Sequence, residues 1–428
     1  MIEVALEPVA GLASGYNGRW IDRSMMAPIE AGLEADGCAL LVGPYEVGKT
    51  ELAAAIGGRF GEGAHILNAS LEDDRAAMRG TDGLLRNSVG RLLVVEEIHG
   101  FPEGLDLIRA ALEGARGRRE LTGQFLLLGS NTTHAQRIVA ERLGTHAPTY
   151  RLSPICLSEL PEPLISTEVA FRFGDLADTE PIPEANDWIE VDRLWLRGGY
   201  PQSLLADSDA KSFSYCERYI EKLCSRNYAH INAALSAASI KEILERVAAN
   251  QGEPFKVDRS KMDQKALLDH LEDLGLVRQL RPWFANHLKR LEKNPKVYLR
   301  DTGLLHALLH RRTLDELRGD SIILGHSWEG FCIENLIGAA PSARPFFYRA
   351  ENEQEEIDLV LEFPGGRRLA IELKSKTAKL GAGFEDAVRA IAPVETFVVR
   401  PIPESSQKSG YREMALTDMI TIVREFGR

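Results

Sequence analysis

The sequence contains no apolar run of the about 18 residues that cross a membrane, although 44% of its 428 residues are hydrophobic. It also lacks an N-terminal signal-peptide pattern. Cysteines are few, and the five are scattered without metal-ligand spacing, which argues against a disulfide framework or a zinc site. They are Cys38, Cys156, Cys216, Cys224 and Cys332. We therefore expect a cytoplasmic protein with reduced thiols and no membrane partner.

Positive charge is scarce as well, since 51 Lys and Arg residues stand against 63 Asp and Glu residues and leave a formal charge of −12. This balance excludes a surface that is basic all over, so any nucleic-acid contact must be local. Internal repeats and low-complexity tracts are also absent. The length allows about two to four domains, each large enough for a core of its own.

The strongest motif that is present fits Gly-x-x-x-x-Gly-Lys-Thr, the P-loop that wraps backbone N–H groups around nucleotide phosphates. A strand-like apolar run, residues 38–42, precedes it, and a helical pattern begins at Glu51. The helix dipole would then point at an anion. The octapeptide is Gly43-Pro44-Tyr45-Glu46-Val47-Gly48-Lys49-Thr50. It predicts ATP as a ligand, with a glycine-rich turn that binds nothing as the alternative.

Three kinds of residue in this loop have separate tasks. Gly43 and Gly48 allow backbone angles and close approach that a Cβ would obstruct. Lys49 is expected to reach the β- and γ-phosphates, and the Thr50 hydroxyl to ligate Mg²⁺. The sequence therefore predicts two cofactors, ATP and Mg²⁺.

A second apolar run, residues 92–95, ends in the adjacent carboxylates Glu96 and Glu97. On a buried parallel strand such a pair lies at the C-terminal edge, facing the nucleotide crevice. We assign Glu96 to the Mg²⁺ side, where Asp is usual and where the extra methylene displaces the carboxylate by about a bond length. Glu97 is the expected catalytic base that polarises the attacking water. Two solvated acids at a strand end are the alternative.

Strand-like and helical runs alternate between residues 38 and 155, which predicts a mostly parallel sheet covered on both faces. Ser130 follows the strand-like run 125–129, where it either senses the γ-phosphate or only ends a strand. An acidic stretch with several prolines, from Phe171 to Trp188, is typical of an exposed connector, and helical runs follow it.

Helical patterns at 241–249 and 263–274, followed by strand-like runs at 276–280 and 296–299, are typical of a winged helix, a frequent DNA-binding module. Basic residues concentrate there, with Trp283, Phe284 and His287 among them: Arg278, Arg281, Lys289, Arg290, Lys293, Lys296 and Arg300. We expect DNA phosphate contacts from Arg281, Lys289, Arg290 and Lys293. A solvated hairpin face, or a dock onto the acidic ATPase domain, explains the charges equally well.

Two strand-like runs near the C-terminus, 356–360 and 369–374, carry a further set of charged residues. Asp358 and Glu372, with the Leu373 carbonyl, form a candidate Mg²⁺ site, and Lys374 would then stabilise charge or orient water during phosphodiester cleavage. Glu372 and Lys374 share a face because strand side chains alternate. Glu329, on a helical run, is a further candidate ligand. The alternative is a hairpin with one exposed ion-pair face.

Together these motifs resemble a large bacterial and archaeal family of AAA-type ATPases whose C-terminal half is a domain of unknown function with a restriction-endonuclease-like end. The resemblance extends from Trp20 to Lys376. Besides the P-loop and Ile98, it rests on Leu128-Gly129-Ser130, Leu157-Ser158-Glu159-Leu160, Arg197-Gly198-Gly199-Tyr200-Pro201, the run from Lys296 to Leu304, Glu356-Ile357-Asp358 and Ile371-Glu372-Leu373-Lys374. It implies an ATPase, a winged helix and a PD-(D/E)XK nuclease-like fold.

The chain departs from the family at two places. Glu96-Glu97 stands where the family has Asp-Glu, and Thr145-His146 where it often has Gly-Arg. Loss of an arginine that neutralises γ-phosphate charge could slow hydrolysis by orders of magnitude. Arg116, Arg118, Arg119, Arg137 and Arg142 are the candidate replacements.

The sequence thus predicts an α/β protein: a P-loop parallel sheet, a helical and winged-helix region, and an α/β restriction-endonuclease-like end. The expected domains are 1–160 (ATPase), 161–240 (connector and helices), 241–315 (winged helix) and 316–428 (nuclease-like). We expect slow Mg²⁺-dependent ATP hydrolysis coupled to DNA binding or processing, with metal-dependent nuclease activity as an open question. The alternative is an ATP-binding regulator or scaffold with a degenerate nuclease fold that binds a protein. A homo-oligomer fits either hypothesis.

Overall fold

The computed structural model of the chain describes residues 21–59, 63–79, 91–114, 124–130, 132–160, 191–225, 236–256, 263–284, 294–350, 354–375, 378–402 and 405–427. The chain divides into two compact units. The first comprises Met1–Ile155 and Asp273–Gly275, and the second comprises Cys156–Glu272 and Leu276–Arg428. No helix in the described ranges is both long and apolar enough to cross a membrane.

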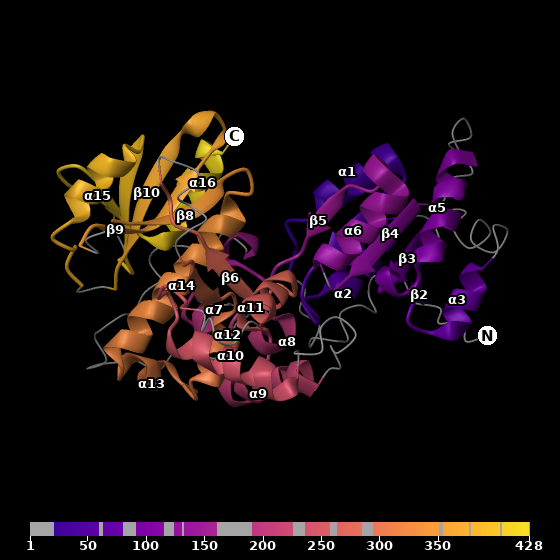
Figure 1. Ribbon diagram of the computed structural model, residues 1–428, viewed down its shortest axis with the longest axis horizontal. Helices are drawn as coiled ribbons and strands as arrows, with labels where there is room; N and C mark the ends of the chain where they lie inside the picture. Colours follow the sequence, from indigo (N-terminus) through magenta and orange to yellow (C-terminus); the bar gives the residue numbers. More distant parts are fainter. Residues whose placement is uncertain are drawn as a thin grey trace. The chain divides into compact units, whose positions relative to one another are not determined.

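The first unit is built on a five-stranded parallel sheet in the order β2-β3-β4-β1-β5 (Figure 1). Its strands are β1 (Cys38–Val42), β2 (Ala64–Asn68), β3 (Leu92–Glu96), β4 (Gln124–Gly129) and β5 (Thr149–Arg151). Every residue of β1 is buried, as expected for a central parallel strand covered on both faces. The carboxyl ends of β3, β4 and β1 therefore lie side by side at one edge.

Helices cover both faces of this sheet: α1 (Met26–Asp36), α2 (Lys49–Gly57), α3 (Glu72–Met78), α5 (Pro102–Gly114) and α6 (Thr132–Leu143), with the short turns η2 (Ile98–Gly100) and η4 (Gly144–His146). Leu40 of β1 and Leu127 of β4 pack in one core with Leu105 of α5 and Val139 of α6. The helices α1 and α2 contact each other and β4, and α1 also contacts β1, whereas α2 contacts β2 and β3. This arrangement confirms the predicted P-loop type of α/β fold.

The second unit begins with helices: η5 (Leu157–Glu159), α7 (Val191–Arg197), α8 (Pro201–Leu204), α9 (Asp209–Ser225), α10 (Ala237–Ala249) and α11 (Asp263–Asp273, whose last residue is counted with the first unit). The antiparallel hairpin β6 (Val277–Leu280) and β7 (Lys296–Leu299) follows, then α12 (Thr302–Leu308), α13 (Leu314–Arg318) and α14 (Ser321–Ala339). The order of two helices and a hairpin is the one that the sequence predicts for residues 241–299.

The C-terminal part holds a six-stranded mixed sheet in the order β12-β13-β11-β10-β9-β8. Its elements are β8 (Arg344–Arg349), β9 (Glu356–Glu362), η8 (Pro364–Gly366), β10 (Arg368–Leu373), α15 (Phe384–Ile391), β11 (Glu395–Val399), β12 (Ser406–Gln407), β13 (Arg412–Met414) and α16 (Leu416–Phe426). The predicted pairing of 356–360 with 369–374 is present as the antiparallel pair β9–β10. The fold class is α/β throughout, with a helical region before the mixed sheet.

Trp283, an aromatic residue of the predicted DNA-binding stretch, is buried in a core, whereas a DNA contact would require it to be exposed. Trp283 follows β6 and is only 5% exposed, because it packs with Phe346, Tyr348 and Val360 in the core of the C-terminal sheet. Its backbone N–H donates to the Phe347 carbonyl at 2.6 Å. Trp283 is therefore a core residue and is not available to stack on a base.

Candidate functional site

The predicted P-loop lies between β1 and α2, and its glycines have steric reasons to be there. A Cβ on Gly43 would lie 2.3 Å from the Leu152 carbonyl oxygen, so only glycine fits beside the segment that follows β5. Gly48 caps α2 with φ of 98°, a left-handed conformation that side chains rarely adopt. The N-terminus of α2 thus opens directly from the loop, as an anion site requires.

The ammonium of Lys49 is held inside the loop. Its Nζ donates to the Gly43 carbonyl at 2.9 Å and to the Pro44 carbonyl at 2.7 Å, and lies 5.8 Å from the centre of the Tyr45 ring. The side chain therefore points back over the loop backbone. Phosphate oxygens would replace the two carbonyls as acceptors.

The two predicted Mg²⁺ ligands are in direct contact. The Thr50 hydroxyl on α2 hydrogen-bonds to Glu96 Oε1 at the end of β3. Asn68 Nδ2, from the end of β2, lies 3.5 Å from Glu96 Oε2. A hydroxyl and a carboxylate at one point supply the hard oxygen donors that Mg²⁺ prefers, so these residues fit the ion. The longer Glu side chain reaches Thr50 despite the usual preference for Asp.

Glu97 is turned toward the next strand. Its backbone is left-handed, with φ of 51°. Ser130 Oγ, at the end of β4, lies 2.7 and 2.8 Å from the two carboxylate oxygens of Glu97. His99 Nδ1 lies 3.3 Å from Glu97 Oε2. The structure thus brings the predicted base and the predicted γ-phosphate sensor together at the sheet edge that carries the P-loop.

Arg23 is a site residue that the motifs do not reveal. Its guanidinium, 7% exposed, donates to the carbonyl of Val47 within the loop at 3.1 Å and to the carbonyl of Ser153 at 2.5 Å. It therefore ties the loop backbone to the segment after β5. Arg23 lies outside the octapeptide and before α1, where no local pattern marks it.

The candidate replacement arginines are only partly described. Arg142 on α6 forms an ion pair with Asp106 of α5, and Arg137 lies 3.4 Å from His134 one turn earlier on the same helix. Arg116, Arg118 and Arg119 lie outside the described residues. Arg142 and Arg137 therefore contact side chains of α5 and α6, respectively.

The C-terminal carboxylates also converge. Lys374 Nζ lies 2.6 Å from Glu372 Oε1 and 3.5 Å from Asp358 Oδ2. The Leu373 backbone N–H donates to Asp358 Oδ2 at 2.9 Å. Burial, together with the nearby Asp358, raises the pKa of Glu372 to about 8. The three predicted residues meet, and the burial of Asp358 and Glu372 does not fit the alternative of an exposed ion-pair face.

Lys296 enters the same cluster, which the sequence did not predict. Its Nζ lies 2.7 Å from Glu356, 3.2 Å from Glu329 and 3.8 Å from Asp358. Tyr298, two residues on in β7, donates to Glu329 Oε1 at 2.6 Å. These carboxylates hold the pKa of Lys296 well above its ordinary value in spite of burial. Over the described ranges, no three His, Cys, Asp or Glu side chains are placed to hold a metal ion.

Other cations of the predicted DNA-binding stretch also form ion pairs within the second unit. Arg278 in β6 and Arg300 just after β7 both bind the carboxylate of Glu334 on α14, Arg300 at 2.8 Å. The two arginines lower the pKa of Glu334 to about 2 against the effect of burial. The hairpin therefore packs against α14, and the alternative of a dock onto the ATPase domain is not needed to explain these charges.

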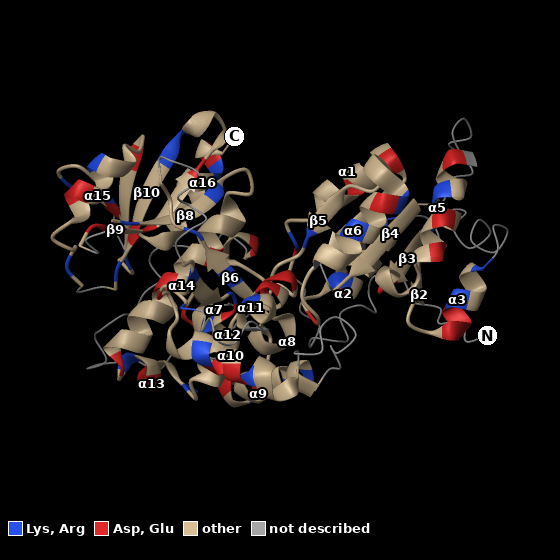
Figure 2. Cartoon of the chain, in the orientation of Figure 1, with Lys and Arg blue, Asp and Glu red and all other residues tan. Residues whose placement is uncertain are grey.

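Of the four residues assigned to DNA phosphates, Arg281 is exposed beside the buried Pro282 and Trp283. Lys289, Arg290 and Lys293 lie outside the described residues. Figure 2 shows Lys and Arg interspersed with Asp and Glu along the drawn elements of the second unit.

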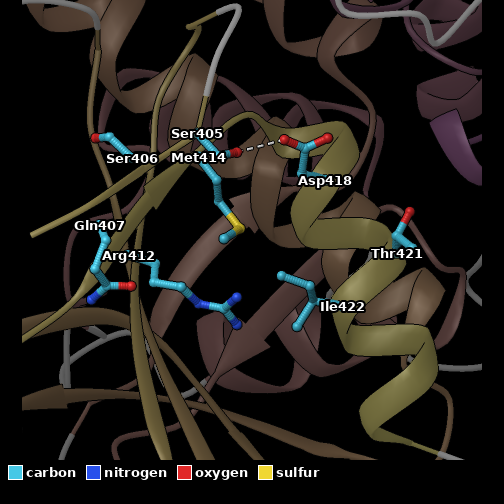
Figure 3. Close-up of a pocket in the computed structure, with 8 residues that line it drawn as sticks. All are labelled: Ser405, Ser406, Gln407, Arg412, Met414, Asp418, Thr421 and Ile422. Carbon is cyan, nitrogen blue, oxygen red and sulfur yellow. Dashed lines mark hydrogen bonds between the residues drawn. The ribbon is translucent and has the colours of Figure 1, made fainter.

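A cavity of about 370 Å³ opens between β13 and α16 (Figure 3). Its lining side chains are Ser405, Ser406, Gln407, Arg412, Met414, Asp418, Thr421 and Ile422. The charged ones are already bound: Arg412 pairs with Glu395 at 2.6 Å, and Asp418 accepts from Ser405 at 2.6 Å. The lining therefore offers a ligand little uncompensated charge.

Three models of known protein domains match successive parts of the chain. Residues 36–161 match the model of an AAA domain. Residues 189–315 and 324–417 match two domains of unknown function, DUF8612 and DUF4143.

Two uncharacterized mycobacterial proteins, Mb2031c of Mycobacterium bovis and Rv2008c of Mycobacterium tuberculosis, are each 28% identical over 391 residues, covering 89% of this chain and 80% of theirs. Among solved structures, the Walker-type ATPase PABY2304 of Pyrococcus abyssi aligns with a TM-score of 0.42 at 13% identity, covering 71% of this chain and 99% of that one. The match to the AAA model, joined to the P-loop geometry, shows that the first unit holds an AAA-type P-loop ATPase domain.

Proposed function

We propose that the first unit hydrolyses ATP slowly with Mg²⁺. Lys49 would bind the β- and γ-phosphates, Thr50 and Glu96 would hold the ion, and Glu97 would polarise the attacking water. One observation carries the proposal: the Thr50–Glu96 and Ser130–Glu97 contacts gather all these groups at the carboxyl edge of β1, β3 and β4. Open α/β sheets bind ligands at that edge.

Slow turnover follows from how Glu97 is held. Both of its carboxylate oxygens lie within hydrogen-bond distance of Ser130, and His99 contacts one of them. A base must lie within hydrogen-bond reach of the water that it activates. Glu97 would have to break some of its contacts with Ser130 and His99 in each catalytic cycle to reach the water, and breaking them would slow hydrolysis.

The test combines nucleotide calorimetry with a phosphate-release assay. Lys49→Ala should weaken ATP binding by roughly 100-fold, because the loop offers no second charged donor in its place. Glu97→Gln should keep affinity and lower turnover by roughly 100-fold, since an amide cannot act as the base. Glu113→Gln, an exposed acid on α5, is the matched control and should behave like the wild type.

The outcomes separate the assignments. Equal ATP affinity of a folded Lys49→Ala protein would remove the nucleotide site from this loop. Turnover that survives Glu97→Gln but is abolished by Glu96→Gln would exchange the roles of the two carboxylates.

For the second unit we propose DNA binding governed by the nucleotide state, supported by the helix–helix–hairpin order and by the basic residues Arg281, Lys289, Arg290 and Lys293 of the sequence. A second candidate is a regulator or scaffold that binds a protein through a nuclease-like fold without cleaving DNA. It is favoured by Lys296, which occupies the carboxylate cluster where cleavage would need a metal ion. Salt-titrated DNA binding distinguishes the two, because phosphate contacts impose a steep salt dependence.

A further inference from the structure

We infer that Lys296 is the built-in cation of the C-terminal carboxylate cluster and that it excludes a divalent metal ion from Asp358 and Glu372. The inference deepens the second candidate function and is independent of the ATP site. The sequence pattern predicts a Mg²⁺ site here, whereas in the structure the ammonium groups of Lys296 and Lys374 lie among the carboxylates.

Three of the four carboxylate oxygens of Asp358 and Glu372 already face an ammonium group. Asp358 Oδ1 lies 3.8 Å from Lys296 Nζ, and its Oδ2 lies 3.5 Å from Lys374 Nζ and accepts from the Leu373 N–H at 2.9 Å. Glu372 Oε1 binds Lys374 at 2.6 Å. Mg²⁺ requires several oxygens at about 2 Å in near-octahedral geometry. An ion placed against Asp358 would stand between two positive charges.

Lys296 is fixed in this position from several sides. Its side chain is 3% exposed, and its ammonium lies within 4 Å of the carboxylates of Glu329 on α14 and of Glu356 and Asp358 on β9. The Phe347 ring of β8 lies 5.5 Å from the same Nζ. Pro254 pairs with Lys296 on the outer side of the hairpin. With so little water nearby, the attraction between these charges is poorly screened. The ammonium is therefore a permanent part of the cluster.

One carboxylate oxygen of the cluster is buried without a hydrogen-bond partner. Glu372 Oε2 is buried and makes no hydrogen bond, and Glu372 as a whole is 4% exposed. Without the Lys296 charge, the carboxylates of Glu329, Glu356 and Asp358 would face one positive charge fewer. A divalent ion would restore the missing positive charge, because buried charges are tolerated only when paired or bound to metal.

The experiment measures Mn²⁺ binding to the full chain by calorimetry without nucleotide. The wild type should show no Mn²⁺ site that Asp358→Asn weakens. Lys296→Met keeps the length of the side chain and removes the charge, and it should gain a site at least tenfold tighter than any in the wild type. That new site should disappear in Lys296→Met/Asp358→Asn. Lys211→Met, an exposed lysine on α9, controls for the loss of one positive charge.

Two results would overturn the inference. One is a wild-type Mn²⁺ site that Asp358→Asn weakens tenfold or more. The other is a folded Lys296→Met protein without any new site. If Lys296→Met does not fold, Lys296→Met/Glu329→Gln removes one charge of each sign and is judged by the same criteria. ATP binding, measured in parallel, should be unchanged, so that failure here is distinct from failure of the ATPase proposal.

Discussion

At the scale of single residues, the candidate ATP site depends on contacts that the P-loop motif does not contain. Ser130 and His99 position Glu97, and Arg23 holds the loop through the Val47 carbonyl. Arg23 does so because a guanidinium can donate in two directions at once, here to Val47 and Ser153. The loop is thus shaped partly by a residue that comes before the first helix.

Arg23→Met should weaken ATP binding by roughly tenfold, because the Val47 carbonyl loses a charge-assisted hydrogen bond and the loop loses its tie to Ser153. Arg23→Lys should recover only part of this, since a lysine is a single point charge without the planar fork. Calorimetry with ATP measures both, after circular dichroism has shown that each variant is folded. Wild-type affinity in Arg23→Met would mean that the loop holds its shape unaided.

At the scale of elements, two motifs that carry the family resemblance interlock as structure. Asp301 caps α12 through the Leu304 N–H at 3.0 Å and accepts from the Gly199 N–H at 2.7 Å. A Cβ on Gly198 would lie 2.2 Å from Asp301 Oδ1, and one on Gly303 would lie 2.1 Å from the Arg197 carbonyl. The run 197–201 and the run 296–304 therefore pack against each other, and their glycines allow the close approach.

A buried histidine links the same elements. His306 Nδ1 lies 2.9 Å from the Leu196 carbonyl, and its Nε2 lies 2.7 Å from Ser327 Oγ, which also accepts from Trp195 Nε1 at 2.9 Å. A neutral ring satisfies every partner, with the proton on Nδ1 and the Ser327 hydroxyl donating to Nε2. Burial lowers the pKa of His306 from 6.5 to about 4.

This pKa predicts a pH-dependent stability of the second unit. The unfolded state binds the proton more tightly, so the stabilisation is complete above pH 6.5 and falls as the pH drops toward 4. At pH 5 the loss is about 2 kcal/mol. Urea unfolding followed by tryptophan emission measures it, because Trp195, Trp283 and Trp328 are all buried in this unit.

His306→Gln is the control, since an amide keeps hydrogen-bonding groups but does not titrate. The difference in unfolding free energy between pH 7 and pH 5 should be smaller in this variant by about the same 2 kcal/mol. An equal pH dependence in both proteins would show that His306 is not the group responsible.

At the scale of the whole molecule, the chain joins an ATPase domain to a second unit whose charges are largely paired internally. Arg278, Arg300 and Lys296 all bind carboxylates of the C-terminal part. The predicted DNA contacts are a separate set in the sequence, the exposed Arg281 together with Lys289, Arg290 and Lys293. With a formal charge of −12, only such a local basic surface can attract DNA.

Replacing Lys289, Arg290 and Lys293 together by Gln should weaken DNA binding and reduce the slope of log K against log salt by roughly one unit for each lost phosphate contact. A salt titration of fluorescence anisotropy with labelled duplex measures both. The control removes the same charge at the exposed Lys211, Lys241 and Arg389, and should bind like the wild type. An unchanged slope in the first variant would favour a protein-facing hairpin.

The sequence by itself determined the parts that depend on local pattern. The glycine spacing of the P-loop, the apolar runs of β1 and β3, and the alternation along β9 and β10 each reflect the geometry of a short segment. These predicted the parallel sheet, the neighbouring positions of Thr50, Glu96, Glu97 and Ser130, and the approach of Asp358, Glu372 and Lys374.

Only the tertiary structure decided which charges meet at long range. The sequence does not distinguish a lysine that faces water or DNA from one that faces a buried carboxylate. Lys296 differs from the neighbouring cations because β7 places its side chain against α14 and β9. Trp283 likewise belongs to a core assembled from strands that follow it in the chain. The residue types are written in the sequence, but their partners depend on how distant elements pack, because an ion pair or a core contact needs proximity in space and not along the chain.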